Sequence, residues 1–269
     1  MRNNDKMKMF FFLLVLILSM GLITACGSNE ASNTSNESDS GNKEASQNEG
    51  KTESKPVTLK LAHQWATPSN GEGDYRSVLA EKFAEEVNKA SNGNIQIEVY
   101  PANSLIPPKE QFDALNKGSL DMAVWAPFYA AGKVPEFSIT LMPGIIQSFD
   151  QAWQWKDEEV GQELNTLLEE NGVKNLVWAW GSMAIASKGE NKIVNPEDVN
   201  GLLFRGAGKD SEKMLESLGA GISSMPSSEI YSALQTNIID GTLTSFDSFL
   251  SYRIFEVVDH FNYTGNNAF

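Results

Sequence analysis

The chain has 269 residues and a formal net charge of −14, with one cysteine and two histidines. This acidity argues against binding to nucleic acid or to anionic lipid headgroups, and it means that an anionic ligand needs a local positive group. A single cysteine excludes an internal disulfide.

The first 25 residues have the pattern of an export signal. A short basic leader precedes the apolar run 10–22, which is shorter than the roughly 20 residues needed to span a bilayer. The run ends in Leu-Ile-Thr-Ala-Cys, which resembles the lipobox of bacterial lipoproteins. We therefore expect a lipoprotein signal peptide at 1–25 and acylation of Cys26; the alternative is a plain signal peptide with a chance cysteine. Loss of 1–25, with three basic residues and one acidic residue, changes the net charge to −16.

A tether is expected at 26–56. Residues 27–55 contain no aromatic residue and no Leu, Ile, Val or Met. Such a composition cannot bury enough apolar surface to fold. A flexible chain of this length has a reach of about 30 Å, which keeps the following domain near the membrane.

The first half of the remaining chain predicts alternating strands and helices. Alternating apolar residues predict strands at 57–62 and 95–99, and apolar residues at helical spacing predict helices at 75–91 and 108–117. A third strand is expected at 120–125. This order is typical of parallel βαβ units.

The second half predicts another α/β unit. Asn195 followed by Pro196 is the pattern of a helix start, because Asn is a good N-cap and Pro fits the first helical position. The other expected elements are a helix at 148–171 in one or two pieces, a buried strand at 175–180, a short strand at 202–204, and helices at 209–218 and 229–236.

Several motifs in this order resemble one known family. The strongest are NPEDVNGLLFR at 195–205 and SEIYSALQT at 228–236 followed by Asp240-Gly241; weaker ones lie at 61–63, 100–101, 119–122 and 252–257. Over about 59–269 the chain resembles the DctP-like extracytoplasmic solute-binding proteins of tripartite ATP-independent periplasmic (TRAP) transporters.

The resemblance implies an α/β, two-lobed fold of the type II periplasmic-binding-protein kind, with a ligand cleft between the lobes. We expect lobe I at 57–180 and lobe II at 181–269. Members of this family continue beyond the point where this chain stops, returning to the first lobe. We therefore expect the sequence to be C-terminally truncated, with the return to lobe I missing.

The function implied by the resemblance is capture of a small carboxylate and its delivery to TRAP membrane permease subunits. The protein would be lipid-anchored at the outer face of the cytoplasmic membrane, with no enzymatic activity and no cofactor. One alternative is a ligand-binding lipoprotein of an ABC importer or a sensor system. Another is a secreted enzyme, against which the two isolated histidines and the lack of a nucleophile motif argue.

Arg205 is the residue that the resemblance assigns to the ligand carboxylate. A guanidinium offers two parallel donors that match a carboxylate, and it loses its hydration more readily than an ammonium. The alternative for Arg205 is a surface or interlobe salt bridge.

Five further residues are candidate ligand contacts. Gln64 and Trp65 follow the first strand and Trp125 ends the third, at the strand ends where α/β proteins bind ligands; loop or core packing is the alternative. The resemblance adds Met183 and Thr244. No metal site is expected, because neither His63 nor His260 has partners at metal-ligand spacing.

The position of Met183 also bears on the ligand. Many family members have a second arginine there, so the resemblance implies a less cationic pocket in this chain. Together with Ser227 at a position that is often aromatic, this favours one carboxylate on an apolar or hydroxylated body. It argues against sialic acid and simple C4-dicarboxylates.

Overall fold

The computed structural model describes residues 55–268, with side chains to residue 263. The predicted signal peptide, Cys26 and all but the last two residues of the predicted tether lie outside the described residues. Within 55–268, no helix is both long enough and apolar enough to cross a bilayer.

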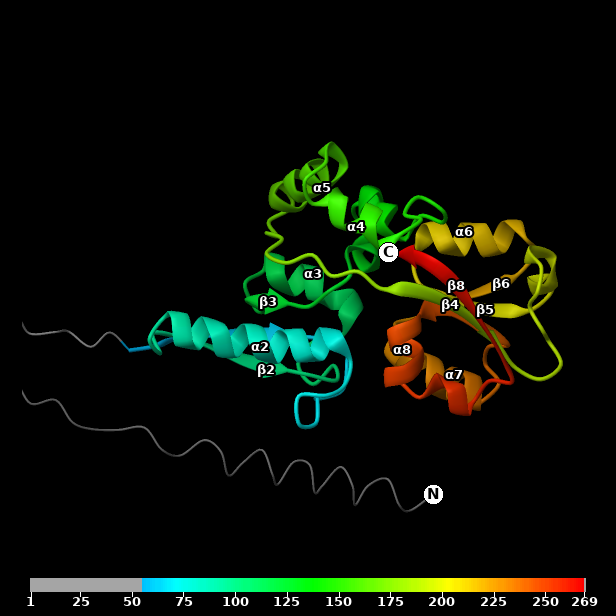
Figure 1. Cartoon of the computed structure of the whole chain (residues 1–269), viewed down its shortest axis with the longest axis horizontal. Helices are drawn as coiled ribbons and strands as arrows, with labels where there is room; N and C mark the ends of the chain where they lie inside the picture. The colour runs from blue at the N-terminus through cyan, green and yellow to red at the C-terminus, as the bar shows by residue number, and fades with distance from the viewer. Residues whose placement is uncertain (1–54, 269) are drawn as a thin grey trace, which may run out of the picture. The chain divides into compact units, whose positions relative to one another are not determined.

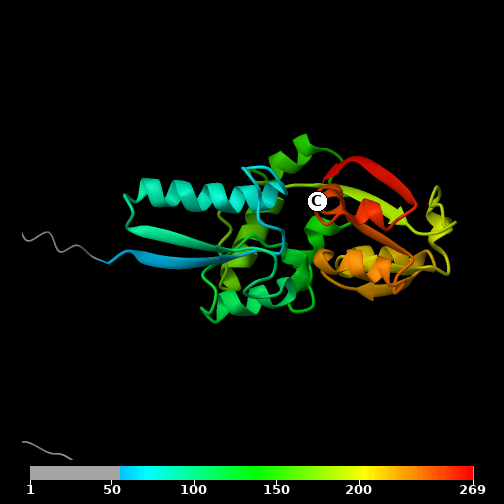
Figure 2. The same cartoon turned by 90° about the horizontal axis from the view of Figure 1, so that it is seen from below.

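The first sheet is parallel and has the strand order β2-β1-β3. Its strands are β1 (Val57–Ala62), β2 (Ile95–Tyr100) and β3 (Met122–Ala123). Helix α2 (Tyr75–Ala90) connects β1 to β2, and α3 (Pro108–Asn116) connects β2 to β3. The predicted parallel βαβ arrangement is confirmed, although β3 is shorter than expected. Figure 2 shows α2 lying along β1 and β2.

Short helices follow the first sheet. They are the 3-10 helices η1 (Pro127–Ala130) and η2 (Pro135–Leu141) and the helices α4 (Phe149–Trp155) and α5 (Glu159–Glu170). The helix predicted at 148–171 is therefore in two pieces. Ser148 caps α4, because its side chain accepts a hydrogen bond from the backbone N–H of Gln151.

The prediction of a buried strand at 175–180 is wrong. Residues 173–181 run as extended chain without strand pairing from α5 to the second sheet (Figure 1). Leu176 is 58% exposed and Val177 is 47% exposed, so the apolar run is not a buried strand. The physical reason is that a strand needs a neighbour for its backbone N–H and C=O groups, and none of the described strands pairs with this segment.

The second sheet is mixed and has the strand order β6-β5-β7-β4-β8. Its strands are β4 (Ser182–Ser187), β5 (Leu203–Gly206), β6 (Gly221–Ser224), β7 (Gly241–Ser245) and β8 (His260–Ala268). Strand β5 is parallel to β6 and β7, whereas β4 is antiparallel to β7 and β8.

Helices cover both faces of the second sheet. Figure 1 shows α6 (Lys209–Ser217) on one face and α7 (Ile230–Gln235) with α8 (Phe246–Ser251) on the other. Three 3-10 helices complete this part: η3 (Pro196–Val199), η4 (Ser227–Glu229) and η5 (Ile254–Glu256). Two apolar clusters, one around Phe204 and Leu215 and one around Ile230 and Phe249, fill the spaces between sheet and helices.

The Asp240-Gly241 motif connects two strands of this sheet. The carboxylate of Asp240 accepts a hydrogen bond from the backbone N–H of Leu203 at 2.8 Å, at the start of β5. A Cβ atom on Gly241 would lie 2.4 Å from the ring of Phe204, so only glycine fits there. The motif thus sets β7 against β5, whose third residue is Arg205.

Candidate functional site

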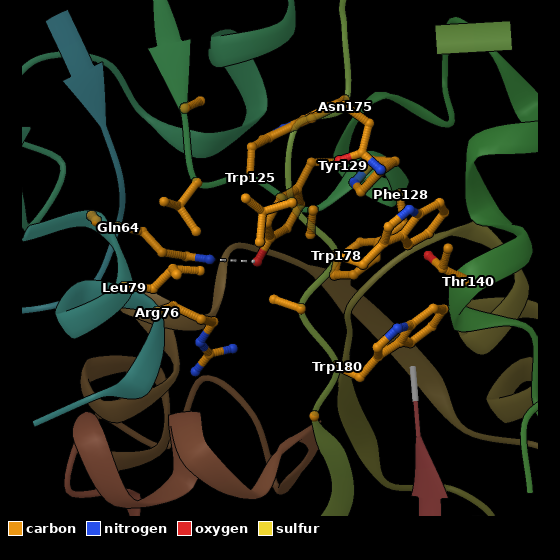
Figure 3. A pocket seen from close by; sticks show the side chains of 18 of the residues that line it. Gln64, Arg76, Leu79, Trp125, Phe128, Tyr129, Thr140, Asn175, Trp178 and Trp180 are labelled. Atoms are coloured by element: carbon orange, nitrogen blue, oxygen red, sulfur yellow. Dashed lines mark hydrogen bonds between the residues drawn. The ribbon is translucent and has the colours of Figure 1, made fainter. Parts of the chain in front are cut away.

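A cavity of about 420 Å³ is lined by residues from both sheets and from the segments between them. The carboxyl ends of β1 and β3 and the residues of β5 and β7 all contribute to its wall. Figure 3 shows Gln64, Arg76 and Leu79 reaching into it from one side and Trp178 and Trp180 from the other.

All six predicted ligand-contact residues line this one cavity. They are Gln64, Trp65, Trp125, Met183, Arg205 and Thr244. Three of them were chosen from strand ends and three from family positions, and the fold brings these distant positions together. Their role in binding stays a prediction.

Arg205 is almost completely buried, at 1% exposure. Its Nε donates to the carbonyl oxygen of Met225 at 2.9 Å and its Nη1 donates to the carbonyl oxygen of Leu243 at 2.8 Å. Burial lowers the pKa of Arg205, while the Tyr129 phenol and the Glu212 carboxylate act to raise it. Within 55–268 no carboxylate forms an ion pair with this guanidinium, so Arg205 forms neither a surface nor an interlobe salt bridge with the described residues.

Tyr129 is a cavity residue that the sequence analysis missed. Its phenol oxygen accepts hydrogen bonds from Gln64 Nε2 at 3.4 Å and from the backbone N–H of Ser227 at 3.3 Å (Figure 3 draws the first). Burial acts to raise the pKa of Tyr129, but the charge of Arg205 and these hydrogen bonds outweigh it and lower the pKa. The phenol is therefore a polarised donor beside the buried guanidinium.

Gln64 joins elements of both sheets around this phenol. Its Oε1 accepts a hydrogen bond from Ser227 Oγ at 3.2 Å, and its backbone carbonyl accepts one from the Tyr252 hydroxyl at 3.0 Å. Gln64 follows β1, whereas Ser227 begins η4 and Tyr252 follows α8. Tyr129 and Ser227 thus orient the side-chain amide at the wall of the cavity, and Tyr252 holds the backbone of Gln64.

Aromatic rings form much of the remaining wall. Trp178 and Trp180 are stacked with ring centroids 5.6 Å apart and an interplanar angle of 6°. Trp125 stacks on Phe112 and meets the edge of Phe137. The indole N–H groups of Trp65, Trp125 and Trp180 are buried and have no hydrogen-bond partner within the described residues. Buried donors without acceptors lower the stability of the fold.

A second guanidinium, that of Arg76, also lines the cavity. The expectation of a less cationic pocket than in family members with an arginine at position 183 stays a prediction. Arg76, which the sequence did not connect with the ligand, enters from α2. Its only signal in the sequence is its place in the first turn of a predicted helix that follows a strand end.

Met183 and Thr244 lie on neighbouring strands. In the antiparallel pairing of β4 with β7, Thr244 is opposite Ala184, the residue after Met183. Within residues 55–268 no group of three or more His, Cys, Asp or Glu side chains is arranged to hold a metal ion.

The family follows from comparison with known proteins. Residues 67–269 match the profile of the bacterial extracellular solute-binding proteins of family 7, also called DctP. The chain belongs to this family. A solute-binding protein of Albidiferax ferrireducens is 43% identical over 199 residues, which are 74% of this chain and 59% of the relative.

Solved structures support the same fold. A TRAP periplasmic solute-binding protein from Rhodoferax ferrireducens with bound malonate is 42% identical, with a TM-score of 0.73 over 76% of this chain and 64% of that chain. A Sulfitobacter homologue with bound β-D-galacturonate is 26% identical, with a TM-score of 0.70 over 76% of this chain and 67% of that chain. The predicted α/β periplasmic-binding-protein-like fold of this DctP-family chain is confirmed. The chain spans about 60% of the length of these relatives.

Members of the family are extracellular and bind substrates, which assigns this DctP-family chain an extracytoplasmic location. The division into lobes at residue 180, the roles of the cavity residues and the lipid anchor on Cys26 stay predictions.

Proposed function

We propose that this DctP-family protein captures a small carboxylate in the described cavity and delivers it to the membrane subunits of a TRAP transporter. The observation that carries the proposal is Arg205, a buried guanidinium at the cavity wall that is bonded to two backbone carbonyl oxygens and to no carboxylate of residues 55–268. A buried cation without an ion-pair partner is costly, and a ligand carboxylate would supply that partner.

The surroundings of Arg205 support a carboxylate as the occupant. The polarised phenol of Tyr129 lies beside it, and the amide of Gln64 lines the same wall. A carboxylate bound here would accept charge-assisted hydrogen bonds, each contributing about 1.5–3 kcal/mol. The related structures with bound malonate and galacturonate have ligands with carboxylate groups, which supports the same class for this chain.

The membrane side of the proposal rests on the sequence. Acylation of Cys26 would hold the protein at the outer face of the cytoplasmic membrane, and residues 27–55 would let the domain reach a permease. Labelling of cells with radioactive palmitate should mark the wild-type protein and not a Cys26→Ser variant. Equal labelling of both would overturn the anchor without affecting the ligand assignment.

The ligand assignment is tested by thermal unfolding of the chain with a panel of carboxylates and neutral sugars. A ligand at 100 times its dissociation constant adds about 2.7 kcal/mol of stability, which raises the unfolding midpoint by several degrees. Arg205→Met should abolish the rise for carboxylates, whereas the exposed control Arg253→Met should retain it. Arg205→Lys, which keeps the charge but loses the forked geometry, should retain part of it. Stabilisation by neutral sugars in all variants would contradict the proposal.

A further inference from the structure

The second guanidinium of the cavity is held in an ion pair at the start of α2. Asp74 caps this helix, and its Oδ1 accepts hydrogen bonds from the backbone N–H of Arg76 at 3.0 Å and from Arg76 Nε at 2.8 Å. Arg76 Nη2 donates to Asp74 Oδ2 at 2.7 Å. The side chain of Asp74 is 1% exposed and that of Arg76 is 11% exposed. Because the pair is bidentate and buried, the charge of Arg76 is committed to Asp74.

Arg76 is also fixed by the groups around it. Its guanidinium carbon lies 4.2 Å from the ring centroid of Trp65. Nη1 donates to Ser245 Oγ at 3.3 Å and Nη2 donates to Ser248 Oγ at 3.1 Å, and both serines lie at the start of α8 and line the cavity. Four of its five N–H groups therefore have acceptors among the described residues, which leaves one on Nη1 for a ligand.

The charges around Arg76 differ from those around Arg205. Asp74 neutralises Arg76, and a further carboxyl, Asp247, lies within electrostatic reach of both. Burial raises the pKa of Asp247, Arg76 acts to lower it, and Asp74 raises it further. The surroundings of Arg76 therefore have no excess positive charge, whereas Arg205 has no ion-pair partner within 55–268.

We infer that Asp74, acting through Arg76, is a specificity-determining positioning residue that selects a carboxylate ligand whose far end is a hydroxyl rather than a second carboxylate. The inference rests on the proposed function, in which Arg205 receives the first carboxylate. A second carboxylate beside Arg76 would face Asp74 and Asp247 with the same sign of charge.

A hydroxyl meets none of this repulsion. It accepts a hydrogen bond from the remaining Nη1 proton of Arg76 and donates one to a hydroxyl oxygen of Ser245 or Ser248. The structure thus favours a hydroxylated monocarboxylate as the ligand class.

The test measures a ratio of affinities rather than one affinity. Matched ligand pairs differ only at one end: 3-hydroxypropionate and malonate, 4-hydroxybutyrate and succinate, gluconate and glucarate. Binding to the chain is measured by titration calorimetry. The affinity ratio is evaluated for the pair that contains the ligand with the highest affinity. We expect the wild-type protein to bind the hydroxy acid of that pair at least tenfold more tightly than the diacid.

Asp74→Asn removes the charge and keeps the helix cap, because Asn is as good an N-cap as Asp. With the charge of Arg76 released, the preference for the hydroxy acid should fall at least tenfold. The control is Glu81→Gln, an exposed residue of α2 with the same change of charge, which should leave the ratio unchanged.

A wild-type preference for the diacid, malonate included, would overturn the inference. An Asp74→Asn variant that weakens both members of a pair equally would also overturn it, because that result indicates a structural role only. If the ligands bind in an Arg205-dependent manner and the ratio does not respond to Asp74, the inference fails and the proposed function stands. If no carboxylate binds the wild-type protein, both fail.

Discussion

The cavity wall includes two buried guanidinium groups, which differ in the groups that they bond to. Arg76 is bonded in a fork to the carboxylate of Asp74, whereas Arg205 is bonded to the carbonyl oxygens of Met225 and Leu243. Arg76 belongs to an internal ion pair, whereas Arg205 has no carboxylate bonded to it within 55–268. An arginine at a pocket wall therefore indicates an anion site only when no side-chain carboxylate of the fold is bonded to it.

The largest expected effect comes from breaking the internal pair. Asp74→Ala leaves the buried Arg76 without its counter-charge, so the free energy of unfolding should fall by about 3–5 kcal/mol. Urea denaturation measures it. The double variant Asp74→Ala/Arg76→Ala should recover part of the loss, because the stranded charge is gone. A loss below about 1 kcal/mol in the single variant would mean that Arg76 is solvated, and the contrast between a paired Arg76 and an unpaired Arg205 would not hold.

A histidine near the same pair should make stability depend on pH. Burial lowers the pKa of His63 to about 4, against the raising effect of the Asp74 charge. The unfolded chain takes up the proton near pH 6.5 and the folded chain only near pH 4. The free energy of unfolding should therefore decrease by about 3 kcal/mol as the pH is lowered from 6.5 to 4. His63→Phe should remove this part of the acid dependence. His260→Phe is the matched control and should leave it in place.

Substitution of Arg205 should affect stability less than Asp74→Ala does, and it should affect carboxylate binding more. Arg205→Met removes an uncompensated cation but leaves two buried carbonyl oxygens without donors, so the ligand-free protein should lose about 1–3 kcal/mol. Carboxylate affinity should fall more than 100-fold, because at least two charge-assisted hydrogen bonds are lost. Calorimetry and urea denaturation of the same samples separate the two effects. A variant as unstable as Asp74→Ala that still binds carboxylates would reverse the assignment of the two arginines.

The smallest expected effect concerns the phenol beside Arg205. Tyr129→Phe leaves the Ser227 N–H without its acceptor and should cost about 1 kcal/mol of stability. Because the charge of Arg205 and hydrogen bonds outweigh burial and lower the pKa of Tyr129, ionisation of this phenol should begin at lower pH than that of an ordinary tyrosine. The ultraviolet absorbance of phenolate should show an early step in the wild-type protein that is missing in Tyr129→Phe. Identical titrations would remove the polarised phenol from the description of the site.

The outcome at 175–180 shows where sequence patterns stop being informative. Leu176 and Val177 have the composition of a buried strand, and strand composition says only that a residue fits a half-buried pleated surface. Whether a neighbouring strand is present is a tertiary fact, and within 55–268 none pairs with this segment. By contrast, β1, β2, α2 and α3 were predicted nearly to the residue, because each has its own apolar period and its own turn residues.

For the site, the sequence predicts the residue types at the strand ends and, through the resemblance, Arg205 as the residue that binds the carboxylate. It could not identify Arg76 or Tyr129 as cavity residues, because their role depends on contacts with Ser245 and Ser227, each more than 90 positions away along the chain. Whether Arg76 or Arg205 is paired with a carboxylate can be seen only in the folded chain. Charge in a sequence is a sum over residues, whereas the charge that a ligand meets depends on which buried groups lie within hydrogen-bond distance of one another.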